Sequence, residues 1–320
     1  MSDSSSVNLG RTGIQISAIG MGTWQWGDKM EWDYGKSHTD LDIQEAFNAG
    51  IQAGITFFDT AEIYGQGRSE RLLGHQVQAL REKVGGTNLV IATKFFPFPW
   101  RMWKGRLKAA LKGSLERLNL KQVDLYQLHW PFPPVSVETW AEGLGEAVKD
   151  GLVRAVGVSN YNIEQTRRAY GVLKHMDIPL ASNQVEYSLL DRKVEKNGLL
   201  PLCQELGITL IAYSPIAKGM LSGKYTPSNP PPGPRGRQYT QDLLARIQPL
   251  IALLREIGQR YDGKSPVQVA LNWLLCKGAV AIPGAKNAQQ AQENSGALGW
   301  CMSSDEVNAL DLASDEAVQA

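Results

Sequence analysis

The chain has 320 residues, 43% of them hydrophobic, and its 33 basic and 32 acidic residues give a formal net charge of +1. This balance gives no reason to expect a nucleic acid or a membrane surface as a partner. The three cysteines lie far apart without a CxxC pair, so neither a disulfide framework nor a metal site of the zinc type is indicated. The polar start, MSDSSSVNLG, lacks the pattern of a signal peptide, and we expect a cytoplasmic protein.

Short apolar runs alternate with longer helical patterns along the chain. Helical patterns include Asp40–Ala53, Leu107–Leu118, Val137–Lys149 and Glu195–Leu206. The expected strands are Ser17–Gly22, Thr56–Asp59, Leu89–Lys94, Val123–His129, Val153–Asn160, Ala181–Tyr187, Thr209–Ser214 and Ala279–Gly284. This alternation predicts an α/β fold, a (β/α)8 TIM barrel that forms a single domain over residues 1–320. The alternative is an open doubly wound sheet, but no GxGxxG follows the first strand.

Three segments depart from a plain barrel. The stretch VNLGRTGIQIS before the first strand predicts a β-hairpin that covers the barrel floor. Lys224–Thr240 is rich in proline and glycine and predicts a long loop after the seventh strand, and such loops are often functional. The tail from Ser303 predicts an added C-terminal helix.

Polar residues stand where the expected strands end, which is the face of an α/β barrel that carries the active site. The second, third and fourth strands end in Asp59, Lys94 and His129, and Tyr64 follows Asp59 on a turn. Further polar residues at the ends of strands five to seven are Ser159, Asn160, Gln184, Glu186, Tyr213 and Ser214.

A buried lysine is costly without a partner, so we expect Lys94 to pair with Asp59. The ammonium group beside the Tyr64 hydroxyl is then expected to lower the tyrosine pKa, and Tyr64 becomes a proton donor. His129 is expected to orient a substrate carbonyl by a hydrogen bond. An Asp–Lys pair at a strand end is often only structural, and a turn tyrosine is often packing; the coincidence of all four residues favours catalysis.

In this arrangement the sequence resembles the aldo-keto reductases. The segment FFDTAEIYGQGRSERLLG resembles the Asp-and-Tyr signature of that family, IATK its lysine strand and LHWP its histidine strand. GVSNY, NQVEYS, YSPIAKGMLSGKY and IPGAKNAQQAQENSGAL match in the same order, from about residue 9 to residue 311. Within that family, the sequence resembles the branch that holds bacterial and plastid reductases, pyridoxal reductase-like proteins and potassium-channel β subunits.

The resemblance implies that NADPH or NADP+ binds across the barrel mouth and that the protein reduces aldehydes or ketones. Ser159, Asn160 and Gln184 are then expected to hold the nicotinamide carboxamide, with Tyr213 stacked on the ring. The other implied cofactor contacts are Thr23, Trp24, Ser214, Pro215, Ile216, Gly219, Leu221, Lys224, Gly284, Lys286, Gln290, Glu293 and Asn294.

Cofactor preference depends on the segment IPGAKNAQQ. Many relatives carry an arginine where this chain has Gln290, so Lys286 and Arg235 are expected to bind the 2′-phosphate instead; Arg237 is an alternative to Arg235. The segment holds no acidic residue that would accept from a free 2′-hydroxyl, which favours NADPH over NADH.

Aromatic residues in the loops after the first, third and fourth strands are expected to form the substrate pocket. The pocket residues are Trp26, Phe95 and Trp130, with Trp24, Phe96, Trp100, Trp103 and Phe132 as further candidates. Such a wall suits flat or apolar carbonyl compounds, although aromatic residues can also merely anchor loops to the barrel.

Two other functions compete with a carbonyl reductase. One is an NADP(H)-binding regulatory or redox-sensing subunit with little turnover; His129, which the channel β subunits lack, speaks against it. The other is a Schiff-base aldolase using Lys94, which would need neither Tyr64 nor the IPGAKN segment. The physiological substrate, the preferred reaction direction and the oligomeric state are not indicated by the sequence.

Overall fold

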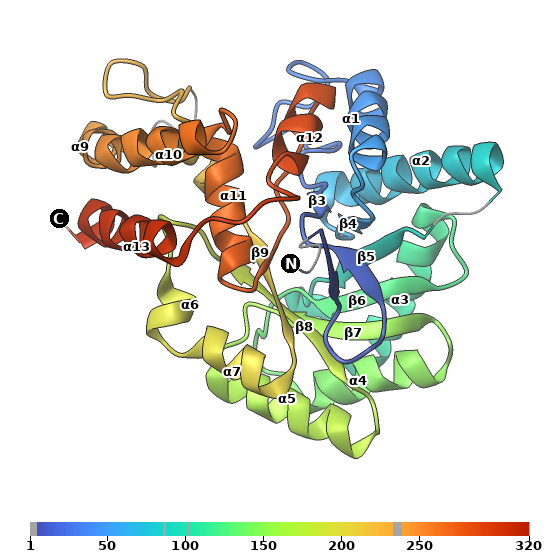
Figure 1. Ribbon diagram of the computed structural model, residues 1–320. Helices are drawn as coiled ribbons and strands as arrows, with labels where there is room; N and C mark the ends of the chain where they lie inside the picture. The colour runs from blue at the N-terminus through green and yellow to red at the C-terminus, as the bar shows by residue number, and fades with distance from the viewer. Residues whose placement is uncertain (1–4, 86–87, 102, 233–238, 320) are drawn as a thin grey trace.

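Eight parallel strands form the centre of the protein, and helices surround them (Figure 1). The computed structural model describes residues 5–85, 88–101, 103–232 and 239–319. Each strand pairs in parallel with the next along the chain, as expected when helices connect neighbours. The strands are β3 (Met21–Gly22), β4 (Phe57–Asp59), β5 (Val90–Phe95), β6 (Val123–Leu128), β7 (Val153–Ser159), β8 (Leu180–Glu186), β9 (Thr209–Tyr213) and β10 (Val280–Ala281).

The first and last strands close the sheet into a barrel. Gly22 pairs in parallel with Gly284, and the Gly22 amide donates to the Pro283 carbonyl at 3.0 Å. A β-carbon on Gly22 would lie 2.8 Å from the Ile282 carbonyl oxygen, so this close approach requires glycine. The predicted (β/α)8 barrel is confirmed.

Helices follow the strands and form the outer layer of the barrel. Predicted strands and helices are found within a few residues of their expected bounds, but the helix expected over Glu195–Leu206 is interrupted at Gly198, whose φ is 82°. The added C-terminal helix is confirmed as α13. The helices are α1 (Asp40–Gln52), α2 (Arg68–Val84), α3 (Lys104–Leu118), α4 (Val137–Lys149), α5 (Ile163–His175), α6 (Lys193–Lys196), α7 (Leu199–Leu206), α9 (Gln241–Arg246), α10 (Gln248–Arg260), α11 (Pro266–Cys276), α12 (Ala288–Ser295) and α13 (Ser304–Gln319).

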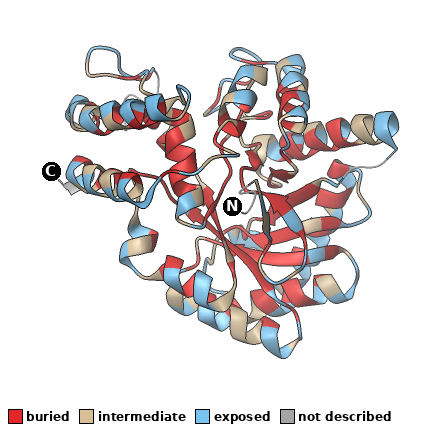
Figure 2. Cartoon of the chain, viewed as in Figure 1, coloured by how far each residue is buried: buried red, intermediate tan, exposed pale blue. Residues whose placement is uncertain are grey.

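Helix α4 shows how the sequence sets a helix and its buried face. The side chain of Ser136 caps the helix by accepting from the Thr139 amide at 3.1 Å. Trp140 and Leu144, four residues apart, lie on one face and are completely buried. Figure 2 shows the same pattern around the barrel, with buried residues on the strands and on the helix faces turned towards them.

Strand β5 shows how a fully buried strand serves two cores. Val90 and Ala92 belong to the apolar cluster inside the barrel, whereas Ile91 and Phe95 belong to the cluster between sheet and helices. Because side chains alternate between the two faces of a strand, Lys94 shares the inner face with Ala92. The strand therefore delivers its lysine to the interior of the barrel, just where the strand ends.

A two-stranded antiparallel hairpin, β1 (Ser6–Asn8) with β2 (Gln15–Ser17), covers one end of the barrel. Leu9, Ile14 and Ile16 of the hairpin are buried in the apolar cluster inside the barrel. The Gly10 amide donates to Thr209 Oγ1, at the start of β9, at 2.7 Å. The predicted hairpin at the barrel floor is confirmed, and the chemistry of the barrel is left to the opposite end.

No helix in the described part of the chain has both the length and the apolar character needed to cross a membrane.

Candidate active site

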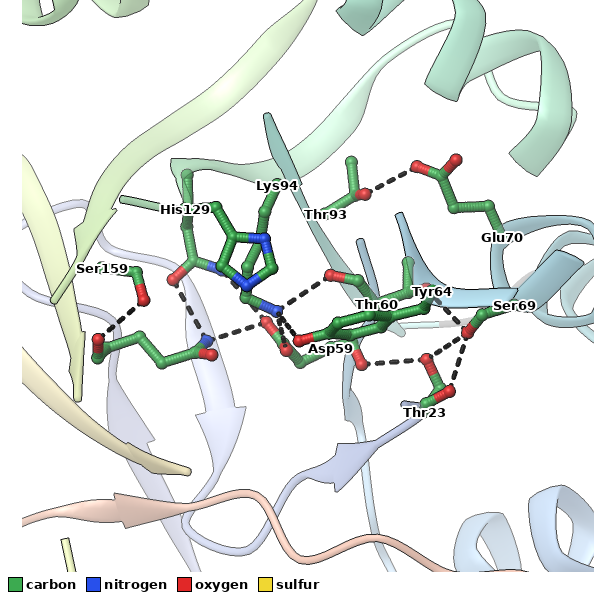
Figure 3. A network of polar contacts seen from close by, with 12 residues as sticks. Thr23, Asp59, Thr60, Tyr64, Ser69, Glu70, Thr93, Lys94, His129 and Ser159 are labelled. Atoms are coloured by element: carbon green, nitrogen blue, oxygen red, sulfur yellow. Dashed lines mark hydrogen bonds and ion pairs between the residues drawn. The ribbon is translucent and has the colours of Figure 1, made fainter. Parts of the chain in front are cut away.

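Lys94 and Asp59 form an ion pair inside the barrel, at the C-terminal ends of β5 and β4 (Figure 3). Lys94 is completely buried, and its ammonium group donates to Asp59 Oδ1. It also donates to the Thr60 carbonyl at 3.0 Å and to the Tyr64 hydroxyl at 3.4 Å. All three donor positions of the ammonium group thus have acceptors, and one of them is the predicted acid.

The second carboxylate oxygen of Asp59 is held by two glutamine side chains. Gln127 Nε2 donates to Asp59 Oδ2 at 3.0 Å, and Gln184 Nε2 donates to the same atom at 2.9 Å. Both amides are buried. Sequence reasoning missed Gln127, which is not among the predicted site residues although β6 carries it two residues before His129. The buried carboxylate is satisfied on both oxygens, so it stays a fixed counter-charge for Lys94.

The pKa values of Lys94 and Tyr64 are set by burial and by their mutual contacts. Burial alone would lower the pKa of Lys94, but the charge and hydrogen-bond effects of Asp59 and Tyr64 together outweigh burial, and the lysine pKa is raised. Burial raises the pKa of Tyr64, and the opposing effect of Lys94 is smaller. The expected lowering of the tyrosine pKa is therefore wrong for this structure. Asp59 offsets much of the ammonium charge, and the phenolate would lose its hydration.

His129 lies over Tyr64 in a position where its imidazole is neutral. Burial, assisted by the charge of Lys94, holds the pKa of His129 well below its usual value. The two rings meet edge to face with centroids 5.8 Å apart. Within the described chain, His129 Nδ1 is buried without a hydrogen-bond partner. A neutral imidazole beside a phenol can hydrogen-bond a substrate oxygen without adding a charge to the site.

A cleft of about 610 Å³ opens above these four residues. Asp59, Tyr64 and His129 line it, whereas Lys94 lies beneath them. Of the predicted cofactor contacts, Leu221 is completely buried and does not line the cleft, and Arg235 and Arg237 lie outside the described residues. The predicted contacts that line the cleft are Thr23, Trp24, Ser159, Asn160, Gln184, Tyr213, Ser214, Pro215, Ile216, Gly219, Lys224, Gly284, Lys286, Gln290, Glu293 and Asn294.

Ser159, Asn160 and Tyr213 form one hydrogen-bonded group in the deep part of the cleft. Asn160 Nδ2 donates to Ser159 Oγ and to the His129 carbonyl, both at 3.1 Å. The Tyr213 hydroxyl donates to Asn160 Oδ1 at 3.0 Å. These contacts fix a flat phenol ring and an amide beside the catalytic candidates, an arrangement that suits a planar ring with a carboxamide.

The loop after β9 has a backbone conformation that is uncommon for its residues. Ser214, Ala217 and Lys218 have φ values of 50°, 48° and 53°, and Gly219 has a φ of 96°. Strained backbone of this kind clusters at ligand sites. Turns that mix right- and left-handed residues direct backbone N–H groups into a concave surface that binds anions. The loop suits a diphosphate.

Gly284 and Gln25 lie next to each other in the wall of the cleft. A β-carbon on Gly284 would lie 2.0 Å from Gln25 Nε2, so any side chain here would displace the glutamine. Gln25 Oε1 is buried and has no hydrogen-bond partner within the described chain. A bare backbone beside an unpartnered amide oxygen suits a polar ligand such as a nucleotide. The residues present therefore fit a dinucleotide.

Lys286 lies at the outer end of the cleft, before α12. Its ammonium group donates to the Trp32 carbonyl at 3.2 Å and to Ser37 Oγ at 3.4 Å. Its backbone amide donates to Gln290 Oε1 at 2.9 Å. Lys286 thus connects the segment before α12 with the loop between β3 and α1, and a phosphate here would share the lysine with these oxygens.

The aromatic residues near Tyr64 differ in part from those expected. Trp24 stacks on Tyr64 with centroids 6.2 Å apart, and Trp130, which lines the cleft, stacks on Phe132 at 5.5 Å. Phe95 and Trp26 do not line the cleft. Phe95 faces the helices and packs against Trp140, and buried Trp26 donates to the Ala285 carbonyl at 2.9 Å.

Other proteins are similar to this chain in sequence and in fold. Residues 18–315 match the model of the Aldo/keto reductase family. The chain is 42% identical over 311 residues to the chloroplastic pyridoxal reductase of Arabidopsis thaliana, covering 95% of this chain and 84% of that protein. It is 33% identical over 311 residues to the L-glyceraldehyde 3-phosphate reductase of Escherichia coli K12, covering 90% and 86%.

Among solved structures, an aldo-keto reductase from Klebsiella pneumoniae in complex with NADPH superposes with a TM-score of 0.75 at 27% identity. The match covers 98% of this chain and 95% of that one. The family model, the relatives and the superposition agree with the geometry of the barrel mouth, and the chain belongs to the aldo/keto reductase family.

Proposed function

We propose that this protein, as one barrel domain, reduces aldehydes or ketones to alcohols with NADPH and uses Tyr64 as the proton donor. The observation that carries the proposal is the contact between the Tyr64 hydroxyl and Lys94, whose charge is balanced by Asp59, at the bottom of a cleft. Packing alone would not require a buried ion pair in contact with the Tyr64 hydroxyl, so this contact favours a catalytic role.

NADPH, when bound in the cleft, supplies hydride to the carbonyl carbon. Ser159, Asn160 and Gln184 would hold its carboxamide, with Tyr213 against the ring. The loop after β9 would hold the diphosphate, and the segment from Gly284 to Asn294 the adenosine part. NADPH in the solved relative supports this assignment.

The chain's own residues manage the substrate oxygen and one proton. The Tyr64 hydroxyl gives its proton to that oxygen as negative charge develops there. The Lys94 ammonium, 3.4 Å away, stabilises the phenolate that is left. His129, held neutral by burial, would donate an N–H to the same oxygen and so orient the carbonyl.

Flat aromatic aldehydes such as pyridoxal are the substrate class that we favour. Trp24 stacked on Tyr64, together with Trp130 at the cleft edge, offers planar apolar surfaces beside the proton donor. The similarity to a pyridoxal reductase over 95% of this chain supports the same class.

A regulatory subunit with little turnover is the second candidate. It needs the cofactor cleft but not a neutral His129 and a complete Asp59–Lys94–Tyr64 chain, which here are all present. A Schiff-base aldolase is less well supported, since Lys94 is charged and has three hydrogen-bond acceptors, whereas a nucleophilic amine must be neutral.

Steady-state oxidation of NADPH, followed by its absorbance, tests the function. The panel consists of pyridoxal, benzaldehyde, short aliphatic aldehydes, ketones and sugars. We expect turnover that is fastest with the flat aromatic aldehydes. Tight NADPH binding without turnover of any carbonyl compound would favour the regulatory subunit and contradict the proposal.

A further inference from the structure

Two cysteines from distant parts of the sequence lie side by side on the surface, away from the cleft. Cys276 is the last residue of α11, and Cys301 lies in the loop between α12 and α13. Both are free thiols exposed to solvent, and the Cys301 thiol is close enough to Cys276 to contribute to raising the pKa of the Cys276 thiol. Cys203, the third cysteine, is completely buried in α7.

The side chain of Asn272 fixes both cysteines in this arrangement. Asn272 lies one turn before Cys276 and is completely buried. Its Nδ2 donates to the Trp300 carbonyl at 2.8 Å, and its Oδ1 accepts from the Met302 amide at 3.3 Å. The Cys276 thiol donates to the same Oδ1 at 3.6 Å. The residues on either side of Cys301 are therefore anchored to the last turn of α11, beside the Cys276 thiol.

We propose that Cys276 and Cys301 form a reversible disulfide by exchange with a small-molecule disulfide such as oxidised glutathione. One thiolate attacks a sulfur of oxidised glutathione, which gives a mixed disulfide and releases one glutathione thiolate. The neighbouring thiolate then attacks the protein sulfur of this mixed disulfide and releases the second glutathione. Two protein thiols lose two protons and two electrons, and one glutathione disulfide becomes two thiols.

The bond would join the end of α11 to the segment that leads out of α12. It would close a loop that contains α12, and Gln290, Glu293 and Asn294 of this helix line the cleft. A cross-link of this kind stabilises the folded state chiefly by restricting the unfolded chain. Partial burial raises the pKa of the Cys276 thiol, so attack by the Cys276 thiolate becomes faster as the pH rises.

Peptide mapping of the full chain tests the proposal. Reduced protein is equilibrated in glutathione buffers of increasing oxidation, quenched with acid, alkylated and digested with trypsin without reduction. Trypsin places Cys276 in peptide 265–277, Cys301 in peptide 287–320 and Cys203 in peptide 197–218. We expect the first two peptides to be linked within one chain, Cys203 to remain alkylated, and the melting temperature to rise by several degrees.

Three serine variants complete the design. Cys276→Ser and Cys301→Ser should lose both the linked peptide and the rise in melting temperature, whereas Cys203→Ser should keep both. Separate glutathione adducts on Cys276 and Cys301 would overturn the proposal. So would a linked peptide that joins two chains, seen as a dimer on a non-reducing gel, or thiols that stay alkylated in the most oxidising buffer.

Discussion

At the scale of single residues, the site depends on which groups contact the buried Lys94 ammonium group. The Lys94 ammonium contacts Asp59, the Thr60 carbonyl and Tyr64, and Gln127 and Gln184 hold the far oxygen of Asp59. A fixed carboxylate keeps the lysine charged, and the charged lysine stabilises the phenolate that forms when Tyr64 gives up its proton. The Asp59–Lys94 pair thus stabilises the Tyr64 phenolate that forms after proton transfer, and it does not bring the pKa of the resting Tyr64 phenol below its usual value.

Burial of Tyr64 and His129 determines the pH dependence that we expect for reduction. Because burial raises the pKa of Tyr64, the phenol remains protonated throughout the neutral range. His129 remains neutral until well below its usual pKa. We expect kcat/KM for aldehyde reduction to be nearly constant from about pH 6.5 to about pH 9 and to fall only as the pH approaches the usual tyrosine value of about 10 or exceeds it. A fall with a midpoint near pH 7 in steady-state assays would contradict this assignment.

The substitution Lys94→Met tests the ion pair itself. It removes the charge that stabilises the phenolate and leaves Asp59 as a buried carboxylate without its cation. We expect a loss of activity of about 10²-fold or more and a loss of unfolding free energy of about 3–5 kcal/mol. Urea unfolding and NADPH oxidation measure the two effects. A stable and fully active variant would show that Lys94 is not part of the catalytic machinery.

At the scale of secondary-structure elements, strand periodicity explains both what the sequence predicted and what it did not. Asp59, Lys94 and His129 were expected together because parallel strands end at one face of a barrel. Phe95 was placed in the pocket from its loop position, but the residue after an inward-facing lysine must face the helices. The break at Gly198 and the contact of Gln127 with Asp59 depend on backbone conformation and on neighbouring strands, which a single sequence does not display.

The loop between β3 and α1 and the segment before α12 meet at Lys286, and this contact affects cofactor choice. Lys286→Ala is expected to weaken NADPH binding by about tenfold, because it removes one charge-assisted hydrogen bond to the 2′-phosphate. NADH, which lacks this phosphate, should bind to the variant nearly as well as to wild type. Titration by tryptophan fluorescence measures both affinities, with the exposed Lys149→Ala as a control. Equal losses for both cofactors would mean that Lys286 only holds the Trp32 carbonyl and the loop.

At the scale of the whole molecule, the two ends of the barrel have different tasks. The hairpin closes the floor with Leu9, Ile14 and Ile16, and the polar side chains gather at the opposite mouth. Stability and chemistry can therefore be changed separately. The alternation of apolar and polar residues along the strands, together with the turn residues, was enough to predict an apolar floor and a polar mouth. It did not predict how deeply Tyr64 is buried, and this burial raises the pKa of Tyr64.

The substitution Ile16→Ala tests the separation of floor and mouth. Ile16 is completely buried in the cluster inside the barrel. Truncation should lower the unfolding free energy by about 2–5 kcal/mol through lost burial and a cavity. The kcat of the folded protein should remain within about twofold of wild type, since distant sites usually act independently. The neighbouring exposed Gln15→Ala serves as the control. A large loss of kcat at full folding would show that floor and mouth are coupled.

The central claim, that Tyr64 is the proton donor of an NADPH-dependent reductase, is tested most directly by Tyr64→Phe. The change removes one hydroxyl and keeps the ring that stacks on Trp24. We measure the single-turnover rate of pyridoxal reduction with bound NADPH and, separately, the NADPH dissociation constant from fluorescence. The account predicts a rate lower by about 10²–10⁴-fold with a dissociation constant close to that of wild type. A variant that reduces pyridoxal at the wild-type rate would contradict it.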